Sequence, residues 1–270
     1  MKTPPDFFHL DQFNISPADV TRGVFRCDPE CIHPDVILMP WWQPDVFGLL
    51  ANRITTITDN ILYELEFKGK TISVIRSGIG APQSGDTVLA LGCTPCERII
   101  FAGSVGGLRP DIHIGDLITP EFSYSGDGFC RYLEPEAPLK DCFLERIFPD
   151  ESLSLALSRS ASPLAEKAGV VIHAGPIFSI DSILAQFRIL NYFTDFLGSI
   201  GIEMETAAVF KAARLVGIQA AALLSVSDVP VINKTLYAGR LPEERNHRKD
   251  IRARVLARAL LDCLSDLPQA

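Results

Sequence analysis

The side chains best suited to chemistry in this sequence are three carboxylates in two short segments. Glu203 and Glu205 lie in GIEMETAAVF, at the start of an apolar helical pattern, and Asp228 ends the aliphatic run AALLSVSD. The exposed amides and the dipole at a helix start stabilise a carboxylate, which is a structural reason for one of the glutamates. Glu205 needs more partners, because Met204 and Ala207 beside it are expected to be buried. Two neighbouring hydroxyls of a sugar would satisfy it.

Asp228 has two interpretations from its pattern alone. It could cap whatever helix follows SVSDVP, which is a common use of aspartate. It could also act as a general acid, because a partly desolvated aspartate with a raised pKa can protonate a departing nitrogen base. Both interpretations stay open at this point.

Three predicted strand ends carry small or polar residues. They read SGIG at 77–80, AGSVGGL at 102–108 and SVSD at 225–228. Ligands of open α/β sheets bind beyond the carboxyl ends of the strands, and glycine lets the backbone approach a ligand closely. We therefore expect these ends to converge on one pocket. Its hydroxyl donors would be Ser77, Ser104 and Ser225.

Hydrophobic periodicity predicts the elements that hold these ends. Aliphatic runs alternate with helical patterns along the chain. They predict strands at 35–40, 97–104, 116–120, 170–180 and 221–228, a hairpin over 61–80, and helices at 46–54, 87–92, 152–169, 203–217 and 243–264. This order predicts an α/β fold, a three-layer α/β/α sandwich around a central mixed sheet. One catalytic domain would span 35–270, behind an N-terminal extension at 1–34.

Composition narrows the class of partner. The chain has 270 residues, 47% of them hydrophobic, and a net charge of −8. Nucleic acid and anionic membranes both require a basic face, so a small molecule is the expected partner. The opening MKTPPDFFHLDQF lacks a secretion signal, and no apolar stretch approaches the roughly 20 residues of a membrane span. A soluble, cytoplasmic protein is expected.

The cysteines predict free thiols rather than disulfides or a metal centre. Their number is seven, which is odd, and no secretion signal accompanies them. Cys27, Cys31 and His33, and separately Cys93 and Cys96, resemble fragments of zinc sites, but each lacks a second half at suitable spacing. We expect neither a metal nor a cofactor.

Four motifs in order resemble one known group of enzymes. AGSVGGL, FSID at 178–181, EMETAA at 203–208 and SVSD at 225–228 are similar to the nucleoside phosphorylase and nucleosidase superfamily. That superfamily includes hexameric purine nucleoside phosphorylase, uridine phosphorylase and methylthioadenosine nucleosidase. The resemblance covers about 35–265, and DFFHL near the N-terminus is similar to the opening of uridine phosphorylase. It implies a nucleoside phosphorylase-like fold and cleavage of an N-glycosidic bond.

The resemblance assigns roles to individual residues. Glu205 matches the glutamate that holds the ribose hydroxyls, Met204 the methionine against the sugar, and Asp228 the aspartate that protonates a purine nitrogen. His9 matches a histidine that reaches a neighbouring subunit, which implies a homo-oligomer, either a dimer or a trimer of dimers. The alternative for His9 is a histidine on a mobile terminus. Further lining of the base pocket would come from Phe178, Ser179, Ile183 and Ser227.

The resemblance also bears on the base. Uridine phosphorylases lack the aspartate that matches Asp228. They carry instead a glutamine and arginine pair for the pyrimidine, and we do not find that pair after Asp181, where the chain reads SILAQFRIL. A purine nucleoside is therefore the favoured substrate.

Departures from the family concern the phosphate site. Phosphorylases follow their first strand with a Gly-Asp-Pro turn and an arginine, where this chain has Trp41, Trp42 and Asp45. Two other family arginines correspond to Phe101 and to a position near Thr58. A phosphate dianion needs cations or many backbone donors in a pocket, because its desolvation is costly. Of the family's phosphate ligands, the hydroxyl of Ser104, next to Gly103, is the one retained.

This pattern favours hydrolysis over phosphorolysis. Asp45 stands near the position at which methylthioadenosine nucleosidase carries a water-activating glutamate, and the two indoles could fill the vacated volume. The alternative for Asp45 is a solvated loop carboxylate beside Pro44. Our leading expectation is a purine nucleosidase, with Asp45 as base and Asp228 as acid.

Two other functions stay open. A phosphorylase could rebuild its anion site with Arg76, in IRSGIG beside Gly78, and Arg245 matches an arginine that assists the aspartate of purine phosphorylases. A non-catalytic nucleoside-binding protein is the third possibility, because a fold by itself guarantees no activity.

Overall fold

The strands that carry the site are nearly continuous apolar runs, as expected for strands covered on both faces. The computed structural model describes residues 8–134 and 140–268, and every residue of β1 is buried. The strands are β1 (Asp35–Met39), β2 (Arg53–Thr58), β3 (Leu62–Phe67), β4 (Lys70–Arg76), β5 (Arg98–Gly107), β6 (Leu117–Gly126), β7 (Arg146–Ile147), β8 (Ile172–Ile180), β9 (Gly201–Glu203) and β10 (Gln219–Asp228).

All ten strands belong to one mixed sheet. Its order is β10-β6-β8-β9-β5-β1-β4-β3-β2, with β7 paired to β6. Strand β10 also pairs with β5, so the strands from β10 to β5 close on themselves. Strands β1, β5 and β10 are parallel neighbours, and their carboxyl ends therefore open at the same edge.

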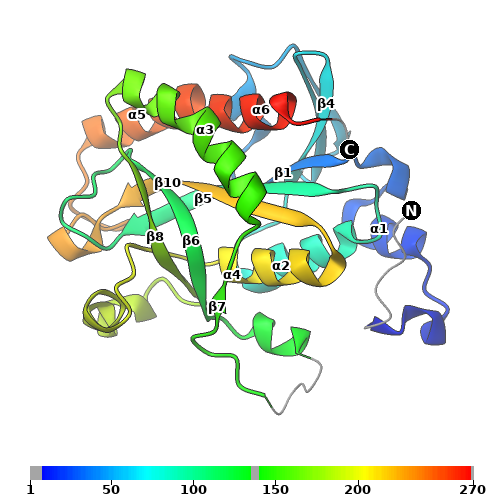
Figure 1. Cartoon of the computed structure of the whole chain (residues 1–270), viewed down its shortest axis with the longest axis horizontal. Helices are drawn as coiled ribbons and strands as arrows, with labels where there is room; N and C mark the ends of the chain where they lie inside the picture. Colours follow the sequence, from blue (N-terminus) through cyan, green and yellow to red (C-terminus); the bar gives the residue numbers. More distant parts are fainter. Residues whose placement is uncertain (1–7, 135–139, 269–270) are drawn as a thin grey trace.

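Helices cover both faces of this sheet (Figure 1). One face packs against α1 (Pro17–Phe25), α2 (Ala81–Leu91) and α4 (Thr206–Val216), and the other against α3 (Glu151–Ala168), α5 (Pro242–Ile251) and α6 (Ala257–Asp266). The three-layer α/β/α sandwich predicted from the sequence is confirmed. A π-helical segment, η9 (Arg252–Leu256), joins α5 to α6. A second π-helical segment is η7 (Tyr192–Phe196). The 3-10 turns are η2 (Leu10–Phe13), η3 (Pro29–Cys31), η4 (Pro44–Phe47), η5 (Phe129–Leu133), η6 (Ala185–Arg188) and η8 (Pro230–Ile232).

Two predicted elements are wrong in part. The helix expected over 46–54 is the single turn η4 followed by β2, because Val46 and Phe47 pack into the core while RITTIT pairs with β3 as an edge strand. The helix expected from 203 begins at Thr206, since Glu203 ends β9 and Glu205 is the N-cap residue. The two glutamates are therefore held by different elements.

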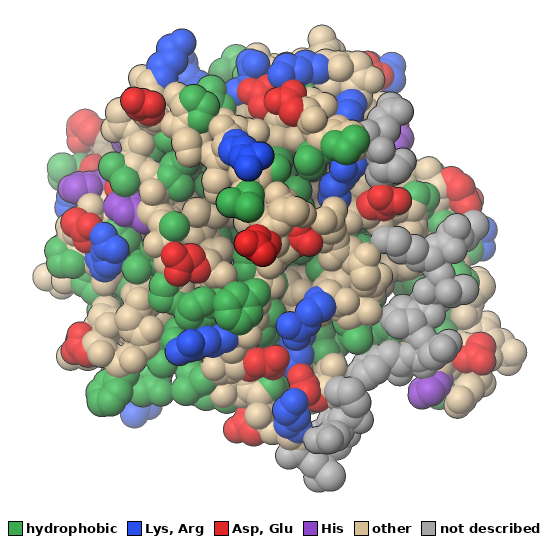
Figure 2. Space-filling view, viewed as in Figure 1, with side chains coloured by type: hydrophobic (Ala, Val, Ile, Leu, Met, Phe, Trp, Pro, Cys, Tyr) green, Lys and Arg blue, Asp and Glu red, His purple; other side chains and the backbone are tan. Residues whose placement is uncertain are grey.

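The surface shows no concentration of one charge on the face that Figure 2 displays. Acidic and basic side chains are interspersed there, over helices and loops alike. Among the described residues, we find no helix with the length and apolar character that a bilayer crossing requires.

Candidate active site

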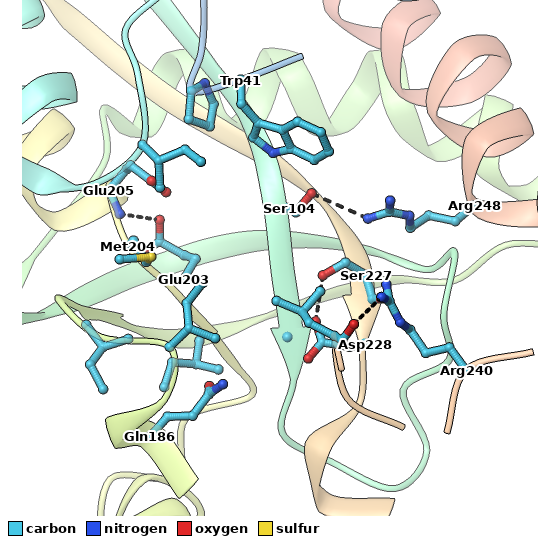
Figure 3. Close-up of a pocket in the computed structure, with 17 residues that line it drawn as sticks. Trp41, Ser104, Gln186, Glu203, Met204, Glu205, Ser227, Asp228, Arg240 and Arg248 are labelled. Atoms are coloured by element: carbon cyan, nitrogen blue, oxygen red, sulfur yellow. Dashed lines mark hydrogen bonds between the residues drawn. The ribbon is translucent and has the colours of Figure 1, made fainter. Parts of the chain in front are cut away.

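A cavity of about 340 Å³ opens at the carboxyl ends of β1, β5 and β10. Pro40 and Trp41, which follow β1, line it together with Ser104 of β5 and Asp228 of β10 (Figure 3). This is the usual ligand crevice of an open α/β sheet, and its volume suits a small molecule. The predicted residues that line it are Trp41, Ser104, Ile183, Met204, Glu205, Ser227 and Asp228.

Two of the three expected hydroxyl donors lie outside this lining. The Oγ of Ser77 lies 2.9 Å from the Oγ of Ser84, and Ser225 is fully buried within β10. Only Ser104, of the three, reaches the cavity.

Glu203 is a carboxylate held by the protein itself. Its Oε2 accepts hydrogen bonds from the backbone N–H groups of Glu205, at 2.7 Å, and Thr206, at 2.8 Å. Its Oε1 accepts from the hydroxyls of Ser179 and Thr206. Burial raises the pKa of Glu203, and these four donors act against that rise. The side chain therefore has little hydrogen-bonding capacity left for a ligand.

Glu205 has fewer partners and remains available. It is 5% exposed, lines the cavity, and accepts a hydrogen bond of 2.7 Å from the N–H of Gly80. Burial, and then the nearby charge of Glu203, raise the pKa of Glu205 to about 8. A ligand that donates two hydroxyl hydrogens would favour the ionised form of Glu205.

Asp228 lies in a different part of the cavity and has its own partners. Its Oδ1 accepts a hydrogen bond of 2.6 Å from the hydroxyl of Ser227. Burial raises the pKa of Asp228, and Ser227 and the guanidinium of Arg240 lower it in part. The N-cap of the following turn η8 is Val229, and no side chain caps it, so the capping interpretation of Asp228 is wrong. Asp228 is therefore a buried carboxyl with a raised pKa, which is what a proton donor to a substrate requires.

The arginine beside Asp228 is Arg240, which the sequence did not single out. Its Nη1 donates to the carbonyl of Ser227 at 3.2 Å, and its Nη2 donates to the carbonyl of Leu236 at 2.6 Å. Arg245, expected in this role, is exposed on α5 and does not line the cavity. The signal in the sequence that could have found Arg240 is its position just before the start of α5.

The anion side of the cavity contains a guanidinium that the sequence analysis missed. Nη1 of Arg248, on α5, donates to the Oγ of Ser104 at 3.5 Å. Figure 3 shows the Arg248 side chain pointing toward Ser104, on the opposite side of Ser104 from Glu205. Burial, and then the charges of Arg252 and Arg240, lower the pKa of Arg248 to about 10, so the group stays cationic at neutral pH. The expected absence of guanidinium groups from this cavity is therefore wrong.

The residues that were expected to shape the nucleophile site lie elsewhere. Asp45 is exposed at the start of η4 and does not line the cavity. Nε of Arg76 donates to the carbonyl of Trp42 and its Nη2 to the carbonyl of Trp41, both at 3.0 Å. Arg76 thus anchors the end of β1 instead of lining the cavity. Trp42 is 3% exposed in the core, while Trp41 is 46% exposed and lines the cavity.

Five other predicted residues also fall outside the lining. Phe178 packs against Phe193 in a buried cluster, and Ser179 bonds Glu203 beneath the cavity. The remaining three are His9, exposed at the start of η2, Gly103, where an added Cβ would lie 3.0 Å from the Phe101 ring, and Gly78, which has a φ of 90° and where an added Cβ would collide with the Gln83 side chain.

Gln186 lines the cavity although it was not selected from the sequence. It is 5% exposed on η6, and its side-chain amide has no hydrogen-bond partner among the described residues. Arg188 follows two residues later and is exposed. A glutamine and an arginine therefore do follow Asp181, contrary to our expectation, and the glutamine reaches the cavity.

Comparison with known proteins identifies the family. The profile of the Phosphorylase superfamily matches residues 52–264. The chain is 30% identical over 245 residues to the uridine phosphorylase of Thermococcus kodakarensis, covering 84% of this chain and 81% of that protein. It is 26% identical over 221 residues to the DeoD-type purine nucleoside phosphorylase of Myxococcus xanthus, covering 78% and 85%.

Hydrolytic relatives and solved structures also match. The chain is 29% identical over 189 residues to the 5'-methylthioadenosine/S-adenosylhomocysteine nucleosidase of Actinobacillus succinogenes, covering 67% of this chain and 80% of that protein. The fold is similar to the crystal structure of uridine phosphorylase from Vibrio fischeri, with a TM-score of 0.71, 24% identity, and coverage of 88% and 97%.

The chain belongs to the phosphorylase superfamily. Members of this family cleave N-glycosidic bonds, either as phosphorylases or as nucleosidases. The superfamily expected from the four sequence motifs is thus confirmed.

Replacing Glu205 with glutamine is expected to stabilise the protein at alkaline pH. Burial raises the folded-state pKa of Glu205 to about 8, above the ordinary glutamate value of 4.5, so its contribution to stability is complete below about pH 4.5 and is lost as the pH rises through about 8. Thermal unfolding should show Glu205→Gln gaining roughly 4 °C over wild type at pH 8.5 and much less at pH 5. Glu121→Gln, at an exposed position of β6, is the control. Equal shifts in both variants would contradict the cost of ionising Glu205.

Proposed function

We propose that this protein cleaves the N-glycosidic bond of a purine nucleoside by phosphorolysis, giving the free base and ribose 1-phosphate. The observation that carries this proposal is the Arg248 guanidinium at 3.5 Å from the Ser104 hydroxyl, inside the cavity that also contains Glu205 and Asp228. Hydrolysis was expected from the sequence because cations were thought to be missing from this position.

The electrostatics of the cavity support an anionic attacking group. Arg248 and Arg240 both line it, whereas Asp45, which was expected to activate water as the base, lies outside. A guanidinium and a hydroxyl together offer several donors to a tetrahedral oxyanion, and charge-assisted hydrogen bonds of this kind are stronger than neutral ones. Neither of the two features that favoured water, a lack of cations and a carboxylate at the nucleophile position, is present in this cavity lining.

The proposed reaction uses three parts of the cavity. Glu205 accepts the ribose hydroxyls, with Met204 against the sugar, and so fixes C1' relative to the anion at Ser104. A phosphate oxygen then forms a bond to C1' as the bond from C1' to the base nitrogen breaks. Asp228 gives its proton to the departing base, which leaves neutral. Because burial raises the pKa of Asp228, that proton is retained better than on a solvated aspartate.

The purine preference rests on Asp228. A purine has ring nitrogens beside the glycosidic bond that can accept a proton as the bond breaks, which matches a proton-carrying carboxyl. The free amide of Gln186 can both donate and accept at an edge of the base, and Ile183 adds apolar contact. The homo-oligomer, the use of His9 by a neighbouring subunit, and a cytoplasmic location remain predictions.

Product analysis with a nucleoside panel tests the reaction directly. Inosine, adenosine, guanosine and uridine would each be incubated with and without phosphate, and base, ribose and ribose 1-phosphate would be quantified. We expect base release from a purine nucleoside to be roughly 100-fold faster with phosphate, with ribose 1-phosphate as the sugar product. Equal rates without phosphate, with free ribose, would instead establish hydrolysis, and tight binding without release would indicate a nucleoside-binding protein.

Two substitutions test whether phosphate or water is the attacking group. Arg248→Met is expected to raise the KM for phosphate by roughly 10- to 100-fold, because it removes a charge-assisted hydrogen-bond donor, while the KM for the nucleoside changes little. Lys249→Met, at the exposed neighbouring position of α5, is the matched control. Asp45→Asn should leave turnover within about twofold of wild type, since Asp45 is exposed. A large loss in Asp45→Asn with none in Arg248→Met would restore the hydrolytic mechanism.

A further inference from the structure

Cys27 and Cys31 form a pair of thiols at the molecular surface, outside the cavity lining. Cys31 ends the turn η3, and Cys27 lies two residues before that turn begins. The Cys27 thiol donates a hydrogen bond to the sulfur of Cys31. Because Cys31 is exposed and Cys27 is partly exposed, a reagent in solution can reach this pair.

The other thiols of the chain are closed to solvent. At most 4% of each of these residues is exposed, and they are Cys93, Cys96, Cys130, Cys142 and Cys263. A dissolved reagent must reach the sulfur to react with it, so structural cysteines buried in this way are inert. The thiol chemistry of the folded protein is therefore concentrated at Cys27 and Cys31.

This pair lacks the further ligands that a metal centre requires. His33, which ends the segment CDPECIH, is engaged through its Nε2 with Glu64 at 2.9 Å. Among the described residues, we find no group of three side chains that could hold a metal ion. Two neighbouring thiols without additional ligands are suited instead to form a disulfide with each other.

The turn that carries the pair has a fixed shape. Pro29 and Ile32 are buried, and the N–H of Cys31 donates to the carbonyl of Asp28 at 3.1 Å. Arg22 holds the carboxylate of Asp28 at 2.7 Å. Because this turn already keeps the two sulfurs in contact, joining them costs little additional chain entropy.

The two thiols differ in the order in which they can react. Burial, and then the charge of Cys31 and the hydrogen bond to it, raise the pKa of Cys27 to about 12. The thiolate is the attacking form of cysteine, so the exposed Cys31 reacts first. Once Cys31 is part of a disulfide it carries no charge, and one cause that keeps Cys27 protonated is removed. Reaction at the first sulfur therefore prepares the second.

We propose that Cys27 and Cys31 are a redox site, which forms an intramolecular disulfide by exchange with a low-molecular-weight disulfide such as oxidised glutathione. The Cys31 thiolate attacks one sulfur of this reagent, which gives a mixed disulfide and releases one glutathione thiolate. The Cys27 sulfur, after losing its proton to solvent, attacks the sulfur of Cys31 and displaces the second glutathione thiolate. The protein is oxidised by two electrons, and the reagent is reduced to two thiols. This site works independently of the reaction in the cavity.

Oxidised glutathione is the probe for this site. The folded protein would be incubated with defined ratios of reduced and oxidised glutathione, and its free thiols would then be alkylated in denaturant and located by mass spectrometry. We expect wild type to accumulate the disulfide between Cys27 and Cys31 while the buried cysteines remain free. Cys27→Ser should retain glutathione on Cys31, with a mixed-disulfide lifetime at least about 10-fold longer than in wild type. Cys142→Ser, at a buried position, is the matched control and should behave as wild type does.

Cys31→Ser should lose the rapid first step, because the remaining Cys27 is the less exposed and more strongly protonated thiol. Thermal unfolding of the reduced variants at positions 27 and 31 should stay within about 2 °C of wild type, which separates the loss of pairing from a loss of folding. The inference is wrong if wild type stops at a stable glutathione adduct on Cys31. It is equally wrong if both thiols stay free under strongly oxidising ratios.

Discussion

The cost of removing charged groups from water governs the arrangement of this cavity. A buried carboxylate is tolerated when hydrogen bonds replace its hydration, and Glu203 receives four donors from its own chain. Glu205 accepts a hydrogen bond from the backbone N–H of Gly80, and burial raises its pKa to about 8. The first glutamate therefore shapes the cavity, and the second is left for a ligand. Two carboxylates two residues apart acquire different uses because their partners differ.

The guanidinium groups of the cavity also differ in how many hydrogen-bond partners the protein gives them. Arg240 is fixed by two backbone carbonyls beside Asp228, whereas Arg248 has one long hydrogen bond, to Ser104. Arg248 and the two glutamates lie on opposite sides of Ser104 in Figure 3, and the described residues show no ion pair between them. Both sets of charges are therefore available to a substrate that carries hydroxyl donors at one end and meets an anion at the other.

The adjacent tryptophans show how strand geometry separates neighbouring residues. Successive side chains along an extended chain point to opposite sides, so Trp41 lines the cavity while Trp42 enters the core toward α5 and α6. Arg76 holds both carbonyls and so fixes the direction of each indole. The two adjacent indoles therefore have different surroundings. Trp41 lines the cavity, and Trp42 packs in the core with its ring against the guanidinium of Arg252.

The family, the sandwich, and the residues whose environment comes from their neighbours along the chain could be predicted from the amino-acid order. Glu205 at a helix start and Asp228 at a strand end belong to this group, because short-range periodicity places them. Which cations reach the cavity depends instead on how distant elements pack together. Arg248 meets Ser104 across 144 positions, and it lies on a polar helix face that periodicity marks as exposed without showing what it faces. The packing of α5 determines this contact, because the rotation of α5 about its own axis relative to the sheet depends on residues far away in the chain.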